Sequence, residues 1–134
     1  MSESEIQIIS MWLKKSANDL RSALILTTAE DYPTDAVCFH CQQSIEKSLK
    51  ALLIYKDIEF KKTHDLVYLL NISGLEQELS NNYLTVFAEI NYYSVTARYP
   101  DEIEDPSIQD SETAYKVAVE IFELVNKRIY QVLF

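Results

Sequence analysis

The stretch from Phe39 to Leu70 constrains the fold of this 134-residue chain more than any other part of the sequence. Its first half belongs to a segment in which apolar residues recur at helical spacing and share one face, at about 100° per residue. These residues are Val37, Cys38, Cys41, Ile45, Leu49, Leu52 and Leu53. On the opposite side, within about 80°, lie the polar residues His40, Gln43, Lys47 and Lys50. A helix with so broad an apolar face must be covered by other elements, and we interpret it as the middle of a helical bundle.

The same spacing predicts helices along most of the chain. Five segments are expected to be helical: 6–30, 34–56, a short helix that opens at 63 and ends near 71–74, 75–96 with an interruption near 80–82, and 112–133. The acidic segment 99–111, which contains Pro106, is expected to be the longest loop. No segment alternates apolar and polar residues as a half-buried strand does. The sequence therefore predicts a single domain, residues 1–134, folded as an all-α antiparallel bundle of four to five helices.

Three helix ends carry recognisable capping residues. Thr34 and Thr63 are expected to be N-caps, and Gly74, the only glycine of the chain, is expected to follow the end of the third helix. Beside the main apolar stripe of the first helix lies a second apolar group, formed by Ile8, Trp12, Ala23 and Leu26. This group either packs on a third helix or forms part of a homodimer contact, and we prefer the intramolecular explanation.

Composition restricts the classes of protein. The formal net charge of −9 opposes sequence-independent binding to nucleic acid. The longest apolar run, residues 51–55, is far shorter than the roughly 20 residues that a membrane-spanning helix needs. Glu3 and Glu5 stand where a signal peptide carries positive charge. We therefore expect a cytoplasmic protein without a membrane segment, and the single glycine excludes glycine-rich phosphate loops.

The two cysteines and two histidines do not form a recognisable metal or catalytic motif. A structural zinc site takes four ligands, and His64 follows Cys38 and Cys41 only after a loop. The Glu-x-x-His pairs of di-metal bundles are also absent, because neither histidine has a glutamate three residues before it. We expect neither a metal nor a cofactor, and we interpret both cysteines as buried core thiols.

Four residues are candidates for contact with a nucleotide or phosphate: Lys47, Lys50, His64 and Arg98. His64 follows two lysines at the start of a helix, where anions are attracted, and Arg98 stands near a helix end from which it could clamp a phosphate. Lys47 and Lys50 belong to the polar stripe. Structural alternatives exist for these residues: His64 can hydrogen-bond backbone groups, Arg98 can pair with nearby acids, and Lys50 can pair with Glu46 four residues earlier.

In the stretch FHCQQSIEKSLKALLIYKDIEFKKTHDLVYLL, followed by YYSVTARYPDE at residues 92–102, the chain resembles a HEPN domain, named for higher eukaryotes and prokaryotes nucleotide-binding. The resemblance covers nearly the whole chain, and its most specific segments are QQSIEKSLKA and KKTHDL. It implies a helical bundle that is frequently dimeric and is often encoded beside a minimal nucleotidyltransferase, with which it forms a pair akin to a toxin–antitoxin system. The chain is also similar to the helical C-terminal domain of kanamycin nucleotidyltransferase.

Many HEPN domains are metal-independent RNases whose active site, formed across a dimer, uses an arginine followed after four to six residues by a histidine. This sequence departs from that pattern, since no histidine stands there after Arg21, Arg98 or Arg128, and no catalytic residue is carried over. The leading hypothesis is a non-catalytic HEPN module that binds a nucleotide or partners a minimal nucleotidyltransferase. The alternatives are an RNase with a non-standard active site that uses His64, and a homodimeric interaction scaffold.

Overall fold

A computed structural model describes residues 1–79, 82–93 and 104–133, without the side chains of 131–133, and within these residues it contains helices and no strand. The elements are α1 (Glu3–Leu26), α2 (Thr34–Tyr55), α3 (Leu66–Ser73), the 3₁₀ helix η1 (Leu75–Gln77), α4 (Tyr83–Tyr93) and α5 (Ile108–Leu133). The predicted all-α fold class is confirmed. None of the helices in the described ranges is long and apolar enough to cross a membrane.

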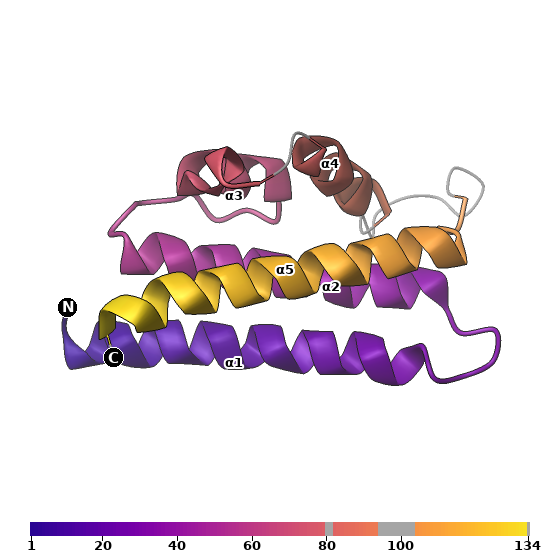
Figure 1. The fold of residues 1–134 in the computed structure, drawn as a ribbon, viewed down its shortest axis with the longest axis horizontal. Helices are drawn as coiled ribbons and strands as arrows, with labels where there is room; N and C mark the ends of the chain where they lie inside the picture. Colours follow the sequence, from indigo (N-terminus) through magenta and orange to yellow (C-terminus); the bar gives the residue numbers. More distant parts are fainter. Residues whose placement is uncertain (80–81, 94–103, 134) are drawn as a thin grey trace.

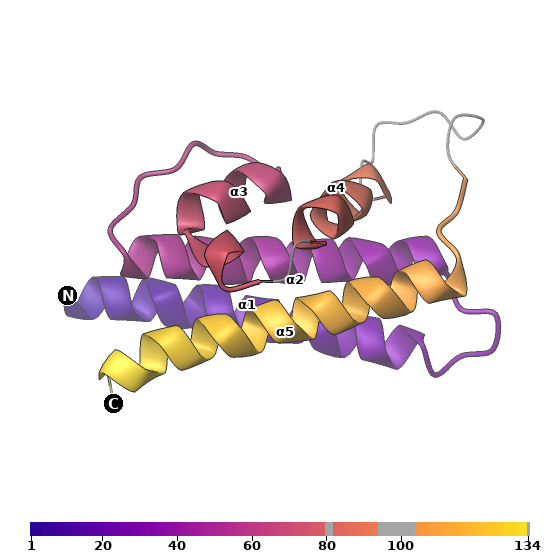
Figure 2. The ribbon, with the colours of Figure 1, turned by 45° about the horizontal axis from the view of Figure 1, so that its top comes forward.

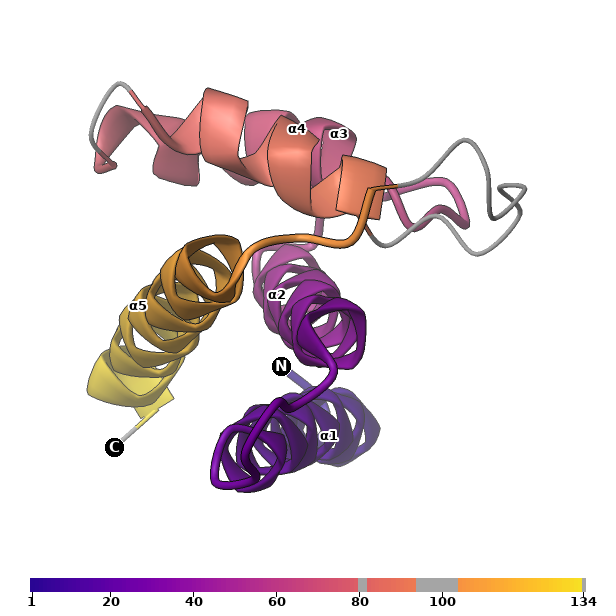
Figure 3. The same ribbon diagram turned by 90° about the vertical axis from the view of Figure 1, so that its right-hand side faces the viewer.

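The long helices α1, α2 and α5 pack as a triangular three-helix bundle, and α3 and α4 lie across one side of it (Figures 1 and 3). Helices α1 and α2 run in opposite directions, whereas α5 runs in the same direction as α2 because the chain crosses back through α3 and α4 (Figure 1). Figure 2 shows the two short helices over α2. Helix α2 contacts α1, α3, α4 and α5, so it is the central element of the bundle.

The core is centred on α2 because the apolar face of this helix is covered on several sides. The largest fully buried side chains come from all the major elements: Ile9, Ile45, Leu49, Leu52, Leu53, Leu66, Leu69, Leu70, Leu75, Phe87, Ile121 and Ile129. A small polar cluster is buried between α1 and α2, where the Ser16 hydroxyl lies 2.8 Å from the Ser44 hydroxyl and 2.7 Å from that of Ser48. These small side chains satisfy one another, which removes the cost of burying an unpaired hydroxyl.

The second apolar group of the first helix packs mostly within the chain. Ala23 is fully buried, and Trp12 and Leu26 pack against the core while remaining partly exposed. Ile8 is 45% exposed and does not join them. The intramolecular explanation therefore holds for three of the four residues.

The predicted N-caps Thr34 and Thr63 are wrong, whereas the predicted position of Gly74 is confirmed. Pro33 occupies the N-cap position of α2 without a side-chain hydrogen bond, and the Thr34 hydroxyl instead donates to the carbonyl of Pro106 at 2.6 Å. The N-cap of α3 is Asp65, whose carboxylate accepts from two backbone amides of the first turn; Thr63 lies outside the helix. Gly74 is the left-handed residue after α3, with φ of +78°, as predicted.

The first and last helices differ in length from the prediction. Helix α1 begins earlier than residue 6, because Ser2 caps it and accepts from the backbone amide of Glu5, and it ends at Leu26 instead of residue 30. Helix α5 begins at Ile108, within the predicted loop. A capping box explains this start: the Asp110 amide donates to the Ser107 hydroxyl and the Ser107 amide donates to the Asp110 carboxylate, both at 2.9 Å.

The predicted fourth helix is divided as expected, since η1 and α4 are separate elements on either side of residues 80–82. Its predicted end at residue 96 lies outside the described residues, as do residues 99–103 of the predicted loop 99–111. The rest of that segment is described: residues 104–107 are not helical, and residues 108–111 belong to α5.

Candidate functional site

The carboxylate of Glu46 is the centre of a polar cluster on α2. Its side chain is only 5% exposed. One oxygen, Oε2, accepts from Lys50 Nζ at 3.1 Å, and the other, Oε1, lies 2.8 Å from His64 Nδ1 and 3.3 Å from Gln42 Nε2. A buried carboxylate with three donors is held in one position, so it can orient the groups bound to it.

Helical spacing produces this arrangement. Gln42, Glu46 and Lys50 are four residues apart and lie one above the other on α2. The Gln42 amide also donates to the carbonyl of His64 at 3.0 Å, so α2 holds both the backbone and the ring of this residue. Gln42 and Glu46 of α2 therefore anchor the segment that leads into α3.

Lys50 is buried, although it lies opposite the main apolar face of the helix. Its side chain is 8% exposed, and its ammonium group lies 5.6 Å from the centroid of the Trp12 ring on α1. The ring covers the cation and attracts it through its π face. The predicted pair of Glu46 with Lys50 is confirmed, but it is buried and does not lie on a solvated surface.

His64 combines a fixed orientation with high exposure. Its side chain is 81% exposed, although Nδ1 rests on the buried Glu46 carboxylate. An ionised carboxylate only accepts hydrogen bonds, so a neutral imidazole here places its proton on Nδ1 and leaves Nε2 as an unprotonated nitrogen. The arrangement can present a hydrogen-bond acceptor or a general base to an approaching molecule.

A second carboxylate, Asp19 on α1, binds the candidate Lys47 together with His40. Asp19 Oδ1 lies 2.9 Å from His40 Nδ1, and Oδ2 accepts from Lys47 Nζ at 2.6 Å. Both histidines of the chain are therefore bound through Nδ1 to a carboxylate that also binds a lysine. Sequence reasoning missed Asp19 because it lies on a different helix, far from its partners in sequence.

The predicted contact residues do not form one common site. Lys50 and His64 share the carboxylate of Glu46, while Lys47 binds Asp19. Each lysine already forms an ion pair with a carboxylate, so its attraction for a phosphate is weaker than that of an unpaired lysine. Arg98 lies outside the described residues.

The cysteines have the inert character predicted for core thiols. Cys38 and Cys41 are both buried thiols, and neither is part of a disulfide. Burial raises the pKa of each thiol to about 12, and negative charge nearby adds to the effect. Within the described residues, no group of three or more His, Cys, Asp or Glu side chains is placed to hold a metal ion.

Comparison with known proteins identifies the class of protein that this fold defines. A sequence model described as the HEPN domain matches residues 9–129, and the chain belongs to the HEPN family. A curated relative from Methanocaldococcus jannaschii, named "Putative toxin MJ1304", is 26% identical over 135 aligned residues, which cover 90% of this chain and 88% of the relative.

A solved structure has the same fold. The crystal structure of ST0689, described as an archaeal HEPN homologue, superposes with a TM-score of 0.67 and 24% sequence identity. The match covers 90% of this chain and 97% of that protein. The helical bundle predicted from the HEPN resemblance is thus confirmed.

Proposed function

We propose that this chain is the HEPN component of a toxin–antitoxin-like pair whose second member is a minimal nucleotidyltransferase. The observation that carries the proposal is HEPN membership over residues 9–129 together with the toxin name of the M. jannaschii relative. The nucleotidyltransferase follows from the gene pairing that the resemblance implies. The chain has no histidine at the nuclease spacing after any arginine, which supports a role through binding instead of RNA cleavage.

The contacts of the polar stripe support a protein partner over a free nucleotide. Lys47 and Lys50 are held by carboxylates and are mostly buried, so neither is prepared to meet a phosphate. In contrast, α1 exposes several apolar side chains: Ile8, Met11, Leu24 and Ile25. Apolar side chains on the surface are suited to contact with another protein. A homodimer through the same helix remains a prediction.

Growth of a bacterial host tests the proposal. The chain is expressed alone, with the minimal nucleotidyltransferase that the proposal expects to be encoded beside it, and with an unrelated nucleotidyltransferase as the control. The proposal predicts slowed growth when the chain is alone and recovery with the paired enzyme only. Normal growth in all three cultures would remove the toxin role. Calorimetric titration of the purified chain with a panel of nucleotides separately tests the nucleotide-binding version, which requires measurable heat.

One observation favours a second candidate, an RNase with a non-standard active site. His64 is exposed and is oriented through Nδ1 by Glu46, as a general base requires. In such a reaction Nε2 would accept the proton of a ribose 2′-hydroxyl, whose oxygen would attack the adjacent phosphorus. The 5′ oxygen would then leave with a proton from water, giving a 2′,3′-cyclic phosphate.

The histidines provide a matched test of this candidate. Purified chain, His64→Ala and His40→Ala are incubated with mixed RNA, because His40 is also anchored through Nδ1 to a carboxylate. The candidate predicts cleavage that is lost in His64→Ala and kept in His40→Ala. Equal cleavage by all three proteins would indicate a contaminant, and absence of cleavage would leave the non-catalytic proposal in place.

A further inference from the structure

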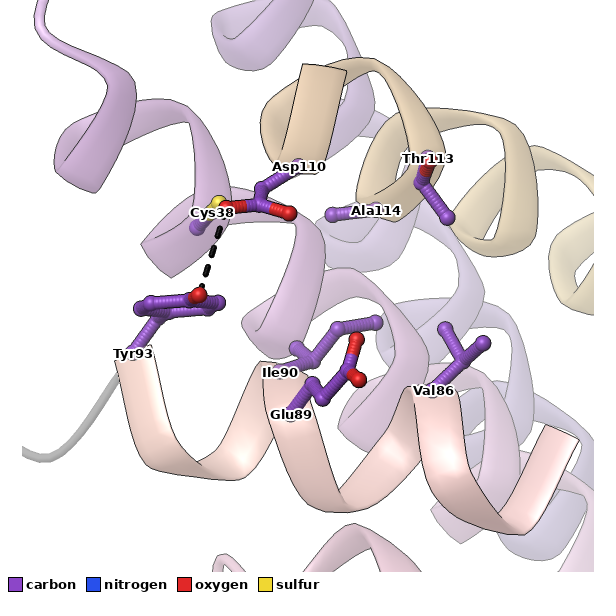
Figure 4. Close-up of a pocket in the computed structure, with 8 residues that line it drawn as sticks. All are labelled: Cys38, Val86, Glu89, Ile90, Tyr93, Asp110, Thr113 and Ala114. Atoms are coloured by element: carbon purple, nitrogen blue, oxygen red, sulfur yellow. Dashed lines mark hydrogen bonds between the residues drawn. The ribbon is translucent and has the colours of Figure 1, made fainter. Parts of the chain in front are cut away.

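A groove separates the N-terminal part of α5 from α4 (Figure 4). Its volume is about 320 Å³, including the open mouth. Buried side chains of Cys38, Ile90 and Ala114 form an apolar floor, and the exposed Glu89 and Thr113 line the rim. The groove is therefore apolar inside and polar at its edge.

Among the described residues, the charged side chains that line the groove are both acidic. They are Glu89 and Asp110, and no lysine or arginine of the described chain belongs to the lining. Asp110 is fixed at the edge of the groove, because its Oδ2 accepts from the backbone amide of Ser107 and from the hydroxyl of Tyr93 at 3.2 Å. In the described part of the chain, Glu89 has no ion-pair partner.

The protonation states keep this charge in place. Hydrogen bonds from Ser107 lower the pKa of the Asp110 carboxyl from its ordinary value, so the group is ionised at neutral pH. Burial and the hydrogen bond to Asp110 raise the pKa of Tyr93, so the phenol stays protonated. Figure 4 shows the Tyr93 ring and the Asp110 carboxylate together at one end of the groove, with Glu89 further along α4.

We propose that this groove accepts a lysine or arginine side chain presented by a partner protein. The aliphatic stem of such a side chain matches the apolar floor, and its cationic head matches the two carboxylates at the rim. The overall charge of −9 also attracts a basic partner and repels a phosphate. The proposal does not depend on the partner being a nucleotidyltransferase.

Nuclear magnetic resonance titration of the full chain tests the proposal with defined probes. The probes are acetyl-Gly-Arg-Gly-amide and acetyl-Gly-Lys-Gly-amide, with citrulline and norleucine replacing the basic residues in the neutral controls. The expected result is saturable shifts of the Ile90, Tyr93 and Ala114 signals with the basic peptides only. Shifts that are equal with the neutral peptides, or absent at these residues up to tens of millimolar peptide, would overturn the proposal.

Two variants test whether the carboxylate of Glu89 contributes to binding of the basic peptides. Glu89→Gln removes one rim carboxylate from an exposed position, so the fold should be kept, whereas Glu123→Gln changes an exposed carboxylate of α5 that does not line the groove. We expect Glu89→Gln to weaken binding roughly three- to tenfold, the effect of losing one charge-assisted contact, and Glu123→Gln to leave it unchanged. Equal affinity in both variants would contradict the proposal. Asp110 is less suitable as the main test because it also caps α5.

Discussion

The buried pair of Glu46 and Lys50 makes the most quantitative prediction for the stability of the fold. Glu46→Gln keeps the shape of the side chain but leaves the Lys50 ammonium, 8% exposed, without a carboxylate. Stranding one charge of a buried pair costs about 3 kcal/mol, a large part of the roughly 5–15 kcal/mol that stabilises a domain. Lys50→Met should cost somewhat less, about 2 kcal/mol, because Glu46 keeps His64 and Gln42 as donors.

The double variant provides the decisive comparison. Glu46→Gln with Lys50→Met contains no buried charge at this position, so its loss of stability should be about 2 kcal/mol smaller than the sum of the two single losses. Urea unfolding followed by circular dichroism measures all three free energies of unfolding. The exposed Glu123→Gln is the control and should stay within about 0.5 kcal/mol of the wild type. Additive losses would refute the argument, because they would mean that the two side chains do not stabilise each other.

Three further predictions concern other parts of the bundle. Gly74→Ala should lower the free energy of unfolding by about 1 kcal/mol, because φ is +78° while a new Cβ would meet only Lys56 Nζ at an ordinary 3.5 Å; an unchanged urea midpoint would contradict this. Cys38 and Cys41, with pKa values raised to about 12, should resist iodoacetamide at pH 8 until the chain is unfolded, and rapid alkylation of the native chain, read by mass spectrometry, would contradict their burial. The lowered pKa of Asp110 stabilises the fold above the unfolded-state pKa, and this stability is lost as pH falls through the folded-state value; Asp110→Asn should therefore be less stable at neutral pH and lose less on acidification, and parallel acid-unfolding curves would argue against the cap.

The helices were predictable because the burial of one helical face is visible in local sequence. The apolar positions of α2, such as Ile45 and Leu49, are fully buried as their spacing indicates. The same local reasoning could have placed the start of α5, since Ser107 and Asp110 have the spacing of a capping box. That start was missed because the acidic residues around it were interpreted as part of a loop.

The candidate site was less predictable because its contacts join distant segments. Spacing alone indicates Glu46 with Lys50, but it does not show that Trp12 covers the lysine or that His64 reaches the same carboxylate. Asp19 likewise meets His40 from another helix. Such pairs depend on how helices are placed against each other, and that placement is set by the whole core instead of by any one segment.

The proposed role of this HEPN chain is to form one half of a pair with a minimal nucleotidyltransferase. Size-exclusion chromatography with light scattering, applied to the chain, the paired enzyme and their mixture at micromolar concentrations, tests it most directly. We expect a new species in the mixture whose mass contains both proteins and whose formation needs no added nucleotide. Elution of the two proteins at their separate masses, with and without nucleotide, would contradict it.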